Sequence, residues 1–316
     1  MVEQRTENPC VGGSIPPLGT TTSFLYNPSM STQLSISSIL VCLLVATGLI
    51  FAASEGSIMI NGYSLFALCA VIGFLLHWII FIPSYVYQTE HYFDLTGSIS
   101  YIAVLVFAIL NKPDIDLRSM LLIVLVGMWA FRLGTFLFLR VKEKGKDSRF
   151  NIMKTKFWWF LATWTIGGLW VFITSCAALA ALASTKLVAL GPFGYLGFLL
   201  WFIGFSIEVI ADSQKTTFNR KRENEHKFIN EGLWQLSRHP NYFGEILLWI
   251  GIAMIAFPVL EGWQLVTLIS PIFVYVLLIK ISGVPMLENK ALKRWGEDPE
   301  YKKYLESTPK LFLKIK

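Results

Sequence analysis

Charged residues are scarce in this chain: Asp, Glu, Lys and Arg together make up 15% of its 316 residues. In soluble globular proteins such residues are nearer to about a quarter of the total. Hydrophobic residues make up 54% of the chain, and the mean hydropathy is +0.55. A water-soluble domain of this size could not bury so much apolar surface, so the composition indicates an integral membrane protein.

Cysteine is also rare, with four residues in the whole chain. Three of them lie inside apolar runs, where a cysteine usually behaves as a small hydrophobic residue. The remaining one, Cys10, stands alone near the N-terminus. No grouping of Cys and His has the spacing of a zinc site, so we predict neither a disulfide scaffold nor a bound metal.

The first residues contain no apolar signal segment, because the first long hydrophobic run begins near Ile36. Residues 1–33 are instead rich in Ser, Thr, Gly and Pro, which predicts a disordered leader. We expect residues 34–316 to form a single membrane domain, because no second soluble domain and no repeat is visible.

Apolar stretches approaching 20 residues recur through the rest of the chain, and each can cross about 30 Å of hydrocarbon as a helix. The eleven tryptophans suit the aromatic belts at the membrane surfaces. The sequence therefore predicts an all-α fold, a polytopic membrane bundle of about seven or eight transmembrane helices. The expected spans are 36–53, 63–87, 98–110, 119–140, 157–183, 193–212, 244–259 and 263–281.

The positions of the basic residues support a count of eight spans. With eight, the Lys- and Arg-rich segments 141–156, 213–243 and the tail after Ile281 all fall on one side of the membrane. The other side keeps only Lys112, Arg118 and Lys186. Positive loops stay in the cytosol, so we expect these loops and both termini to be cytosolic, beside anionic lipids. Binding of nucleic acid is not expected, since no soluble recognition fold presents the charge.

The loop 88–96 also falls on the basic side, and it combines two acids, a histidine and a tyrosine without any Lys or Arg. One interpretation is a solvated connection with an aromatic anchor. The other is a catalytic cluster, in which Glu90 or Tyr92 hydrogen-bonds or protonates a polar group of a substrate at the membrane surface.

The sixth span ends in a polar helix face. Glu208, Asp212, Lys215 and Asn219 recur at the spacing of one face if the helix continues through Arg220. Glu208 lies within the apolar run, where an ionisable group is costly and is usually paired or functional. The face is either a structural ion network or part of a ligand site.

The segment Leu236–Glu245 opens the seventh span. Pro240 is typical of a first helical turn, whose free N–H groups attract anions. Arg238 offers a planar fork for phosphate or carboxylate, His239 adds a donor, and Glu245 could hold a ribose hydroxyl or a cationic group. The plainer interpretation is a capped helix with an interfacial Arg-His pair.

The sequence RHPNYFGE (238–245) resembles the signature of membrane-bound steroid 5-alpha-reductases and of sterol carbon-14 and carbon-7 reductases. The whole stretch 88–316 is similar to an uncharacterised branch with the steroid 5-alpha-reductase C-terminal domain. The similar segments are QTEHYFDLTGS (88–98), FLRVKEKGKDSRF (138–150), EVIADSQKTTFN (208–219), LSRHPNYFGEILLWIGI (236–252) and the tail from Glu288 to Phe312.

This resemblance implies reduction of a polarised carbon–carbon double bond by NADPH, with the cofactor held in the C-terminal half, about 157–316. The apolar substrate, a lipid or a steroid-like molecule, would enter laterally from the bilayer. Eukaryotic relatives suggest that the protein is in the endoplasmic reticulum, with a bacterial inner membrane as the alternative. The cofactor-binding residues carried over by motif are Asp212, Lys215, Arg220, Arg238, His239, Asn241, Tyr242, Glu245, Glu288 and Lys290.

Two positions depart from the steroid 5-alpha-reductase pattern. Glu208 stands where those enzymes have an asparagine one turn before the aspartate, and their adjacent Gln-Glu pair is interrupted here by Thr89. A keto-steroid is therefore only one option for the substrate.

Isoprenylcysteine carboxyl methyltransferases carry a similar Arg-His-Pro element and a similar tail. An S-adenosylmethionine-dependent methyltransferase is accordingly an alternative, and a non-enzymatic membrane scaffold is another. The element Asp212–Phe218 favours the reductase, because it is more similar to sterol reductases.

Overall fold

The computed structural model describes residues 31–144 and 150–314, which form a helical bundle with one short hairpin. The predicted leader falls almost entirely outside these residues, although its last residues already belong to the first helix, whose N-cap is Ser31. In chain order the elements are α2 (Thr32–Ala53), β1 (Met59–Ile60), β2 (Tyr63–Ser64), α3 (Leu65–Val86), α4 (Phe93–Leu110), α5 (Leu117–Lys144), α6 (Phe150–Met153), α7 (Phe157–Ala183), α8 (Pro192–Arg220), η2 (Arg222–Asn224), η3 (Gly232–Gln235), α9 (Pro240–Ala256), η4 (Phe257–Val259), η5 (Gly262–Ile269), α10 (Ser270–Val276), η6 (Leu277–Ile281), α11 (Gly283–Trp295) and α12 (Pro299–Ser307).

The described part of the chain contains eight helical segments that are long and apolar enough to cross a membrane. They confirm the all-α fold and the eight predicted spans, with shifted boundaries at several of them, including the first, which begins at Thr32, the sixth, which ends at Arg220, and the seventh, which begins at Pro240. The third span begins at Phe93 rather than near residue 98. The eighth runs from Gly262 to Trp295 through a 3-10 segment, an α-helix and a turn of π-helix before α11. The chain is thus an integral, multi-pass membrane protein.

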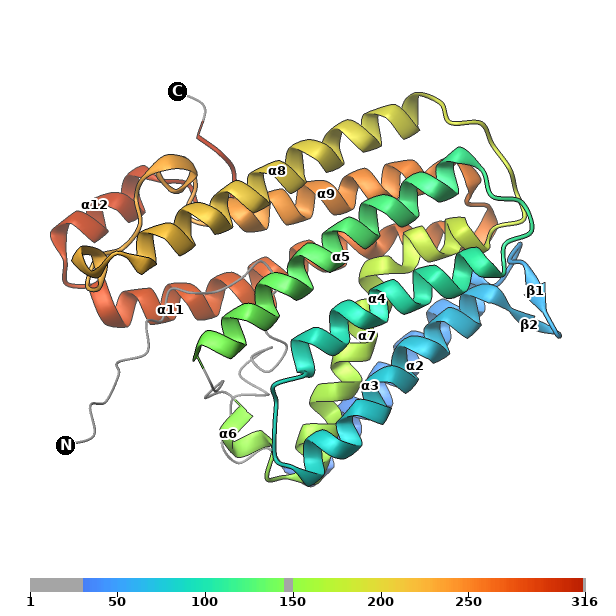
Figure 1. Cartoon of the computed structure of the whole chain (residues 1–316), viewed down its shortest axis with the longest axis horizontal. Helices are drawn as coiled ribbons and strands as arrows, with labels where there is room; N and C mark the ends of the chain where they lie inside the picture. Colours follow the sequence, from blue (N-terminus) through green and yellow to red (C-terminus); the bar gives the residue numbers. More distant parts are fainter. Residues whose placement is uncertain (1–30, 145–149, 315–316) are drawn as a thin grey trace.

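Helix α7 forms the centre of the bundle. It packs against α2, α3, α4, α9 and α10, and almost all of it is buried. Gly168 allows this approach, because a Cβ at that position would lie 2.9 Å from the ring of Phe74 on α3. Helices α8 and α9 form the other main pair and run side by side along the upper edge in Figure 1.

The connections fall into two groups, as the parity of eight spans requires. We call one group the basic end: residues 87–92, 150–156, 221–239 and the tail 296–314. The other is the hairpin end: residues 54–64, 111–116, 184–191 and 257–261, with β1 and β2 on the right in Figure 1. Contacts support the grouping, since Lys154 pairs with Glu90 at 2.6 Å and Ser57 bridges to Ser184.

The basic residues at the hairpin end are engaged in structural contacts. The Lys112 ammonium donates to the carbonyl oxygens of Leu182 and Ser184, where α7 ends. Arg118 donates to the carbonyls of Ile255 and Ala189. Because these cations are tied to carbonyl groups within the fold, the exposed positive charge is concentrated still further at the basic end.

Candidate functional site

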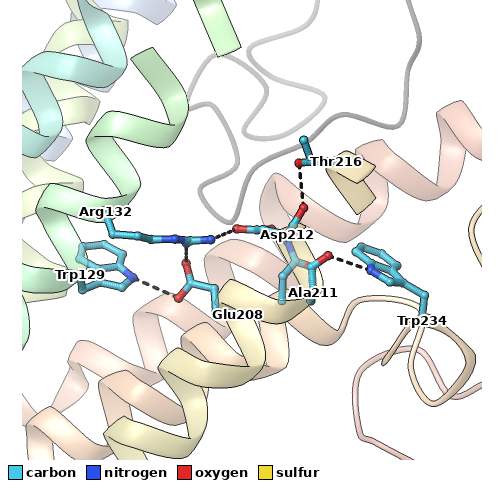
Figure 2. A network of polar contacts seen from close by, with 8 residues as sticks. Trp129, Arg132, Glu208, Ala211, Asp212, Thr216 and Trp234 are labelled. Atoms are coloured by element: carbon cyan, nitrogen blue, oxygen red, sulfur yellow. Dashed lines mark hydrogen bonds and ion pairs between the residues drawn. The ribbon is translucent and has the colours of Figure 1, made fainter. Parts of the chain in front are cut away.

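The centre of the candidate site is Arg132, which projects from α5 toward two acids on α8 (Figure 2). Its Nη1 lies 2.5 Å from Glu208 Oε1 and its Nη2 lies 2.5 Å from Asp212 Oδ2. The second oxygen of Glu208 accepts a hydrogen bond of 3.2 Å from the Trp129 indole. Both carboxylates are buried, so the guanidinium compensates charge that the apolar bundle could not otherwise hold.

Helix α9 completes this network because two pairs of glycines bring it very close to α8. A Cβ on Gly204 would lie 2.5 Å from the Gly244 carbonyl oxygen, and a Cβ on Gly197 would lie 2.6 Å from the carbonyl oxygen of Gly251. At this separation the Asn241 amide reaches Asp212 Oδ1 at 3.3 Å.

Glu245 lies one helical turn further along α9 and is 2% exposed. Its Oε2 atom is buried and has no hydrogen-bond partner in the described structure. An unpaired polar atom at this depth is costly, and such atoms in native proteins call for an explanation, such as a ligand or a water. Glu245 Oε2 is therefore a candidate contact for a ligand.

The predicted polar face of the sixth span is confirmed, because α8 continues as one helix to Arg220. Glu208 and Asp212 enter the network described above. Further along, the Lys215 ammonium lies 4.3 Å from the centre of the Trp234 ring, and the Trp234 indole donates to the Ala211 carbonyl (Figure 2). Segment η3 is thereby fixed against the end of α8.

The Arg-His-Pro element forms a second cluster at the start of α9. Arg238 Nη1 lies 2.8 Å from Glu288 Oε1 on α11, and the Lys310 ammonium lies 3.2 Å from Glu288 Oε2. His239 Nε2 is 3.6 Å from Glu288 Oε1, too far for a hydrogen bond. Burial lowers the pKa of His239, and the neighbouring cations Lys215 and Arg238 act in the same direction, against Glu288.

Several polar atoms in this cluster have no hydrogen-bond partner among the described residues. Both ring nitrogens of His239 and the Arg238 Nε are buried without a hydrogen bond. The His239 ring stacks on Tyr242 with ring centres 5.6 Å apart. The set of unused donors and nearby cations fits an anionic ligand.

The C-terminal tail lies across this cluster. The Arg238 backbone N–H donates to the Pro309 carbonyl, Lys314 N–H donates to the Leu236 carbonyl, and the Ser237 hydroxyl donates to the Leu311 carbonyl. The tail is therefore part of the site rather than a free extension.

The structure brings most of the predicted cofactor residues into one region. Asp212, Asn241 and Glu245 lie around Arg132, and Arg238, His239 and Glu288 lie one turn away, with Tyr242 and Lys215 beside them. Arg220 ends α8, and Lys290 lies on α11 two residues beyond Glu288; both are exposed at the basic end.

Of the two predicted catalytic residues, one is paired at the basic end and the other is exposed there. Glu90 is buried and pairs with Lys154 next to α6, and Tyr92 is 52% exposed at the start of α4. Their catalytic role stays a prediction.

Arg132 and Trp129 were not predicted as site residues from the sequence. Arg132 stands inside the expected span 119–140, and an arginine within an apolar run is itself a signal, because an intramembrane charge requires a partner. Its pairing with Glu208 and Asp212 depends on how α5 packs against α8, which no local pattern shows.

The fold and site together define an all-helical, multi-pass membrane protein with a buried ion network at one end. The chain belongs to the family described as "Protein of unknown function (DUF1295)", whose model matches residues 77–308. That range contains all of the residues discussed above from Glu90 to Lys290. No curated protein and no solved structure matches the chain.

Proposed function

We propose that the chain is a membrane oxidoreductase that uses NADPH to reduce a polarised carbon–carbon double bond in a hydrophobic, steroid-like or other lipid substrate. The observation that carries the proposal is the junction of two clusters at one end of the bundle. The Arg132–Glu208–Asp212–Asn241 network adjoins the Arg238–His239–Glu288 cluster through the first turns of α9.

The residues of these clusters have the chemistry that a dinucleotide phosphate requires. Arg238, Lys310 and Lys215 supply positive charge, and the first turn of α9 supplies backbone N–H groups for phosphate. The ring nitrogen of neutral His239 that carries hydrogen can donate to a phosphate oxygen, and the other can accept from a ribose hydroxyl. The unpaired Glu245 oxygen lies one turn further along α9, at the inner edge of this region.

The cofactor would supply the hydride, as nicotinamides do, while the protein binds and orients. Reduction of a double bond adds the hydride to one carbon and a proton to the other. The 88–96 loop offers the proton from Tyr92 or Glu90. Since Lys154 pairs with the Glu90 carboxylate, Tyr92 is the less constrained of the two donors.

In this proposal the substrate and the cofactor reach the site from different phases. The apolar substrate would enter laterally from the bilayer, and the cofactor would arrive from the cytosol at the basic end. By analogy with eukaryotic proteins that the sequence resembles, we place the chain in the endoplasmic reticulum, with the basic loops and both termini cytosolic.

Thermal unfolding of the purified, full-length protein tests this proposal. A ligand at 100 times its Kd stabilises the protein by about 2.7 kcal/mol, which is easily measured. We expect NADPH and NADP to raise the midpoint, and Arg238→Ala or Asn241→Ala to reduce that shift. Arg222→Ala, at an exposed arginine in η2, is the matched control and should leave the shift unchanged.

Three outcomes separate the alternatives. Stabilisation by S-adenosylmethionine alone would reject the reductase in favour of a methyltransferase. No shift with any of these ligands would favour a membrane scaffold. An Arg238→Ala variant that binds NADPH as tightly as the wild type would show that the cofactor lies elsewhere.

A further inference from the structure

Deep in the bundle, four buried polar atoms have no hydrogen-bond partner in the described structure. They are the Tyr101 hydroxyl on α4, the Thr174 hydroxyl on α7, and Glu245 Oε2 and Trp249 Nε1 on α9. All four side chains are at most 2% exposed. Buried polar groups are normally paired, so four unpaired atoms on three packed helices are unusual.

The four side chains belong to one cluster. The Tyr101 ring lies 5.2 Å from the Trp129 ring and 6.2 Å from the Trp249 ring, and the two tryptophan rings are 4.9 Å apart. The Tyr101 hydroxyl lies beside the Thr174 hydroxyl and near the Glu245 carboxyl group, without a hydrogen bond of normal geometry to either.

This cluster lies well inside the membrane. Tyr101 follows the first residue of α4 by eight positions, or about 12 Å, and Trp249 follows the first residue of α9 by nine positions, or about 14 Å. The hydrocarbon core is about 30 Å thick, so both rings lie near its middle. Bulk water is absent there, and unpaired polar atoms are especially costly.

We propose that this cluster binds the hydroxyl group of an uncharged lipid alcohol. The tryptophan indole only donates a hydrogen bond, the tyrosine and threonine hydroxyls donate and accept, and a glutamate carboxyl group keeps an acceptor oxygen whether or not it is protonated. A hydroxyl group both accepts and donates, so it can satisfy this mixed set. A ketone or an ether only accepts, and leaves an acceptor of the site unpaired. A charged head group is excluded by the cost of burying it at this depth.

Only the role of this lipid alcohol as the substrate rests on the proposed function; its binding does not. Glu245 is one turn from Asn241, so the lipid hydroxyl would lie at the inner edge of the proposed cofactor region. The rings of Trp129 and Trp249 enclose the cluster and must shift to admit a ligand. Tryptophan fluorescence therefore provides a direct signal of binding.

The test measures lipid binding by the full-length protein in detergent, without any nucleotide, so its result is independent of NADPH binding. The probes form two sets, and the compounds of each set have the same carbon skeleton. One set is cholestan-3-ol with its ketone and its methyl ether, and the other is hexadecan-1-ol with its aldehyde and its methyl ether. Fluorescence and thermal unfolding report the affinity. We expect at least one alcohol to bind about tenfold more tightly than the carbonyl compound and the ether of its set.

The variants locate the site. Tyr101→Phe and Glu245→Gln should each weaken alcohol binding at least about fivefold and leave ether binding unchanged. Tyr195→Phe, on the exposed side of α8, is the matched control and should change nothing. The proposal fails if the carbonyl compounds or ethers bind as tightly as the alcohols, or if Tyr101→Phe leaves alcohol binding intact. It also fails if no alcohol binds, since water alone would then pair with these atoms.

Discussion

Gly204 on α8 and Gly244 on α9 are in backbone contact, since a Cβ on either residue would lie 2.5 Å from the carbonyl oxygen of the other. The contact sets the distance between two helices that carry Glu208 and Asp212 on one side and Asn241 and Glu245 on the other. The site therefore depends on two residues that have no side chain.

Substitution at this contact should be strongly destabilising. Gly204→Ala or Gly244→Ala forces a methyl group against backbone, which cannot move aside as a flexible side chain can. Overpacking usually costs about 1–3 kcal/mol, and we expect the upper part of that range or more. Gly127→Ala is the matched control on α5, because nothing lies within 4 Å of its Cβ position, and it should be neutral or stabilising. Thermal unfolding in detergent gives the comparison, and equal midpoints for the three variants would show that α8 and α9 are not held so closely.

Removal of Arg132 should destabilise the protein, because two buried acids then lose their counter-charge. Breaking a buried ion pair on one side costs about 3–5 kcal/mol, so Arg132→Gln should lower the unfolding midpoint markedly. A triple variant, Arg132→Met with Glu208→Gln and Asp212→Asn, removes the charges together and should recover most of that stability. If the network binds cofactor, the triple variant will still fail to respond to NADPH. A triple variant that is stabilised by NADPH as the wild type is would make the network purely structural.

Glu288 should compete with an anionic ligand for Arg238 and Lys310. Glu288→Gln removes that carboxylate, so we expect the affinity for NADPH to rise by roughly tenfold, equivalent to about 1.4 kcal/mol. Lys310→Gln should lower the affinity a few-fold, because it removes one cation from the same group. Glu297→Gln, at an exposed acid near the tail, is the control. Equal affinity in the wild type and Glu288→Gln would place the phosphates away from this cluster.

The stability of the protein should decline in mild acid through His239. Burial lowers the pKa of this histidine, whereas in the unfolded chain it titrates near about 6.5. Below that pH the unfolded state binds a proton at this histidine, whereas the folded state resists protonation. The contribution of neutral His239 to the free energy of unfolding is therefore complete above about pH 6.5. It falls as the pH decreases, by at most about 1.36 kcal/mol per pH unit. His239→Gln should reduce the loss of midpoint between pH 8 and pH 5.5. His91→Gln, at an exposed histidine, should not, and equal losses in both variants would refute the assignment.

The two ends of the bundle should be accessible from opposite sides of the membrane. In a Cys10→Ser background the described cysteines are all buried, so a new cysteine can be labelled selectively. His226→Cys and Lys310→Cys should react with an impermeant maleimide only when it reaches the cytosolic side, and Leu187→Cys only from the other side. Labelling of His226→Cys and Leu187→Cys from the same side would contradict the eight-span topology.

The number of spans was predictable from the sequence, because each long helix must supply its own run of apolar residues to face lipid. The start of α4 was not, since Phe93, Asp94 and Thr96 look like a polar loop and become helical through tertiary contacts. Phe93 packs against Phe150 and Trp164, and these contacts explain why the helix begins at Phe93.

The polar face from Glu208 to Lys215 was also predictable, because helical spacing alone decides which residues share a face. The pairing of that face with Arg132 was not predictable, since the two segments are 76 residues apart and meet only through packing. The same holds for Tyr101 and Thr174, whose hydroxyl groups look unremarkable in the sequence and are notable only because the folded bundle leaves them unpaired.

By itself, the sequence determined that the chain crosses a membrane, how often it crosses, and which end carries the positive charge. These properties follow from local hydropathy and from the simple alternation of spans. Only the tertiary structure decided which polar groups meet. In hydrocarbon a polar atom must find its partner within the protein, and the close contact between α8 and α9 and the packing of α5 determine which partners are within reach.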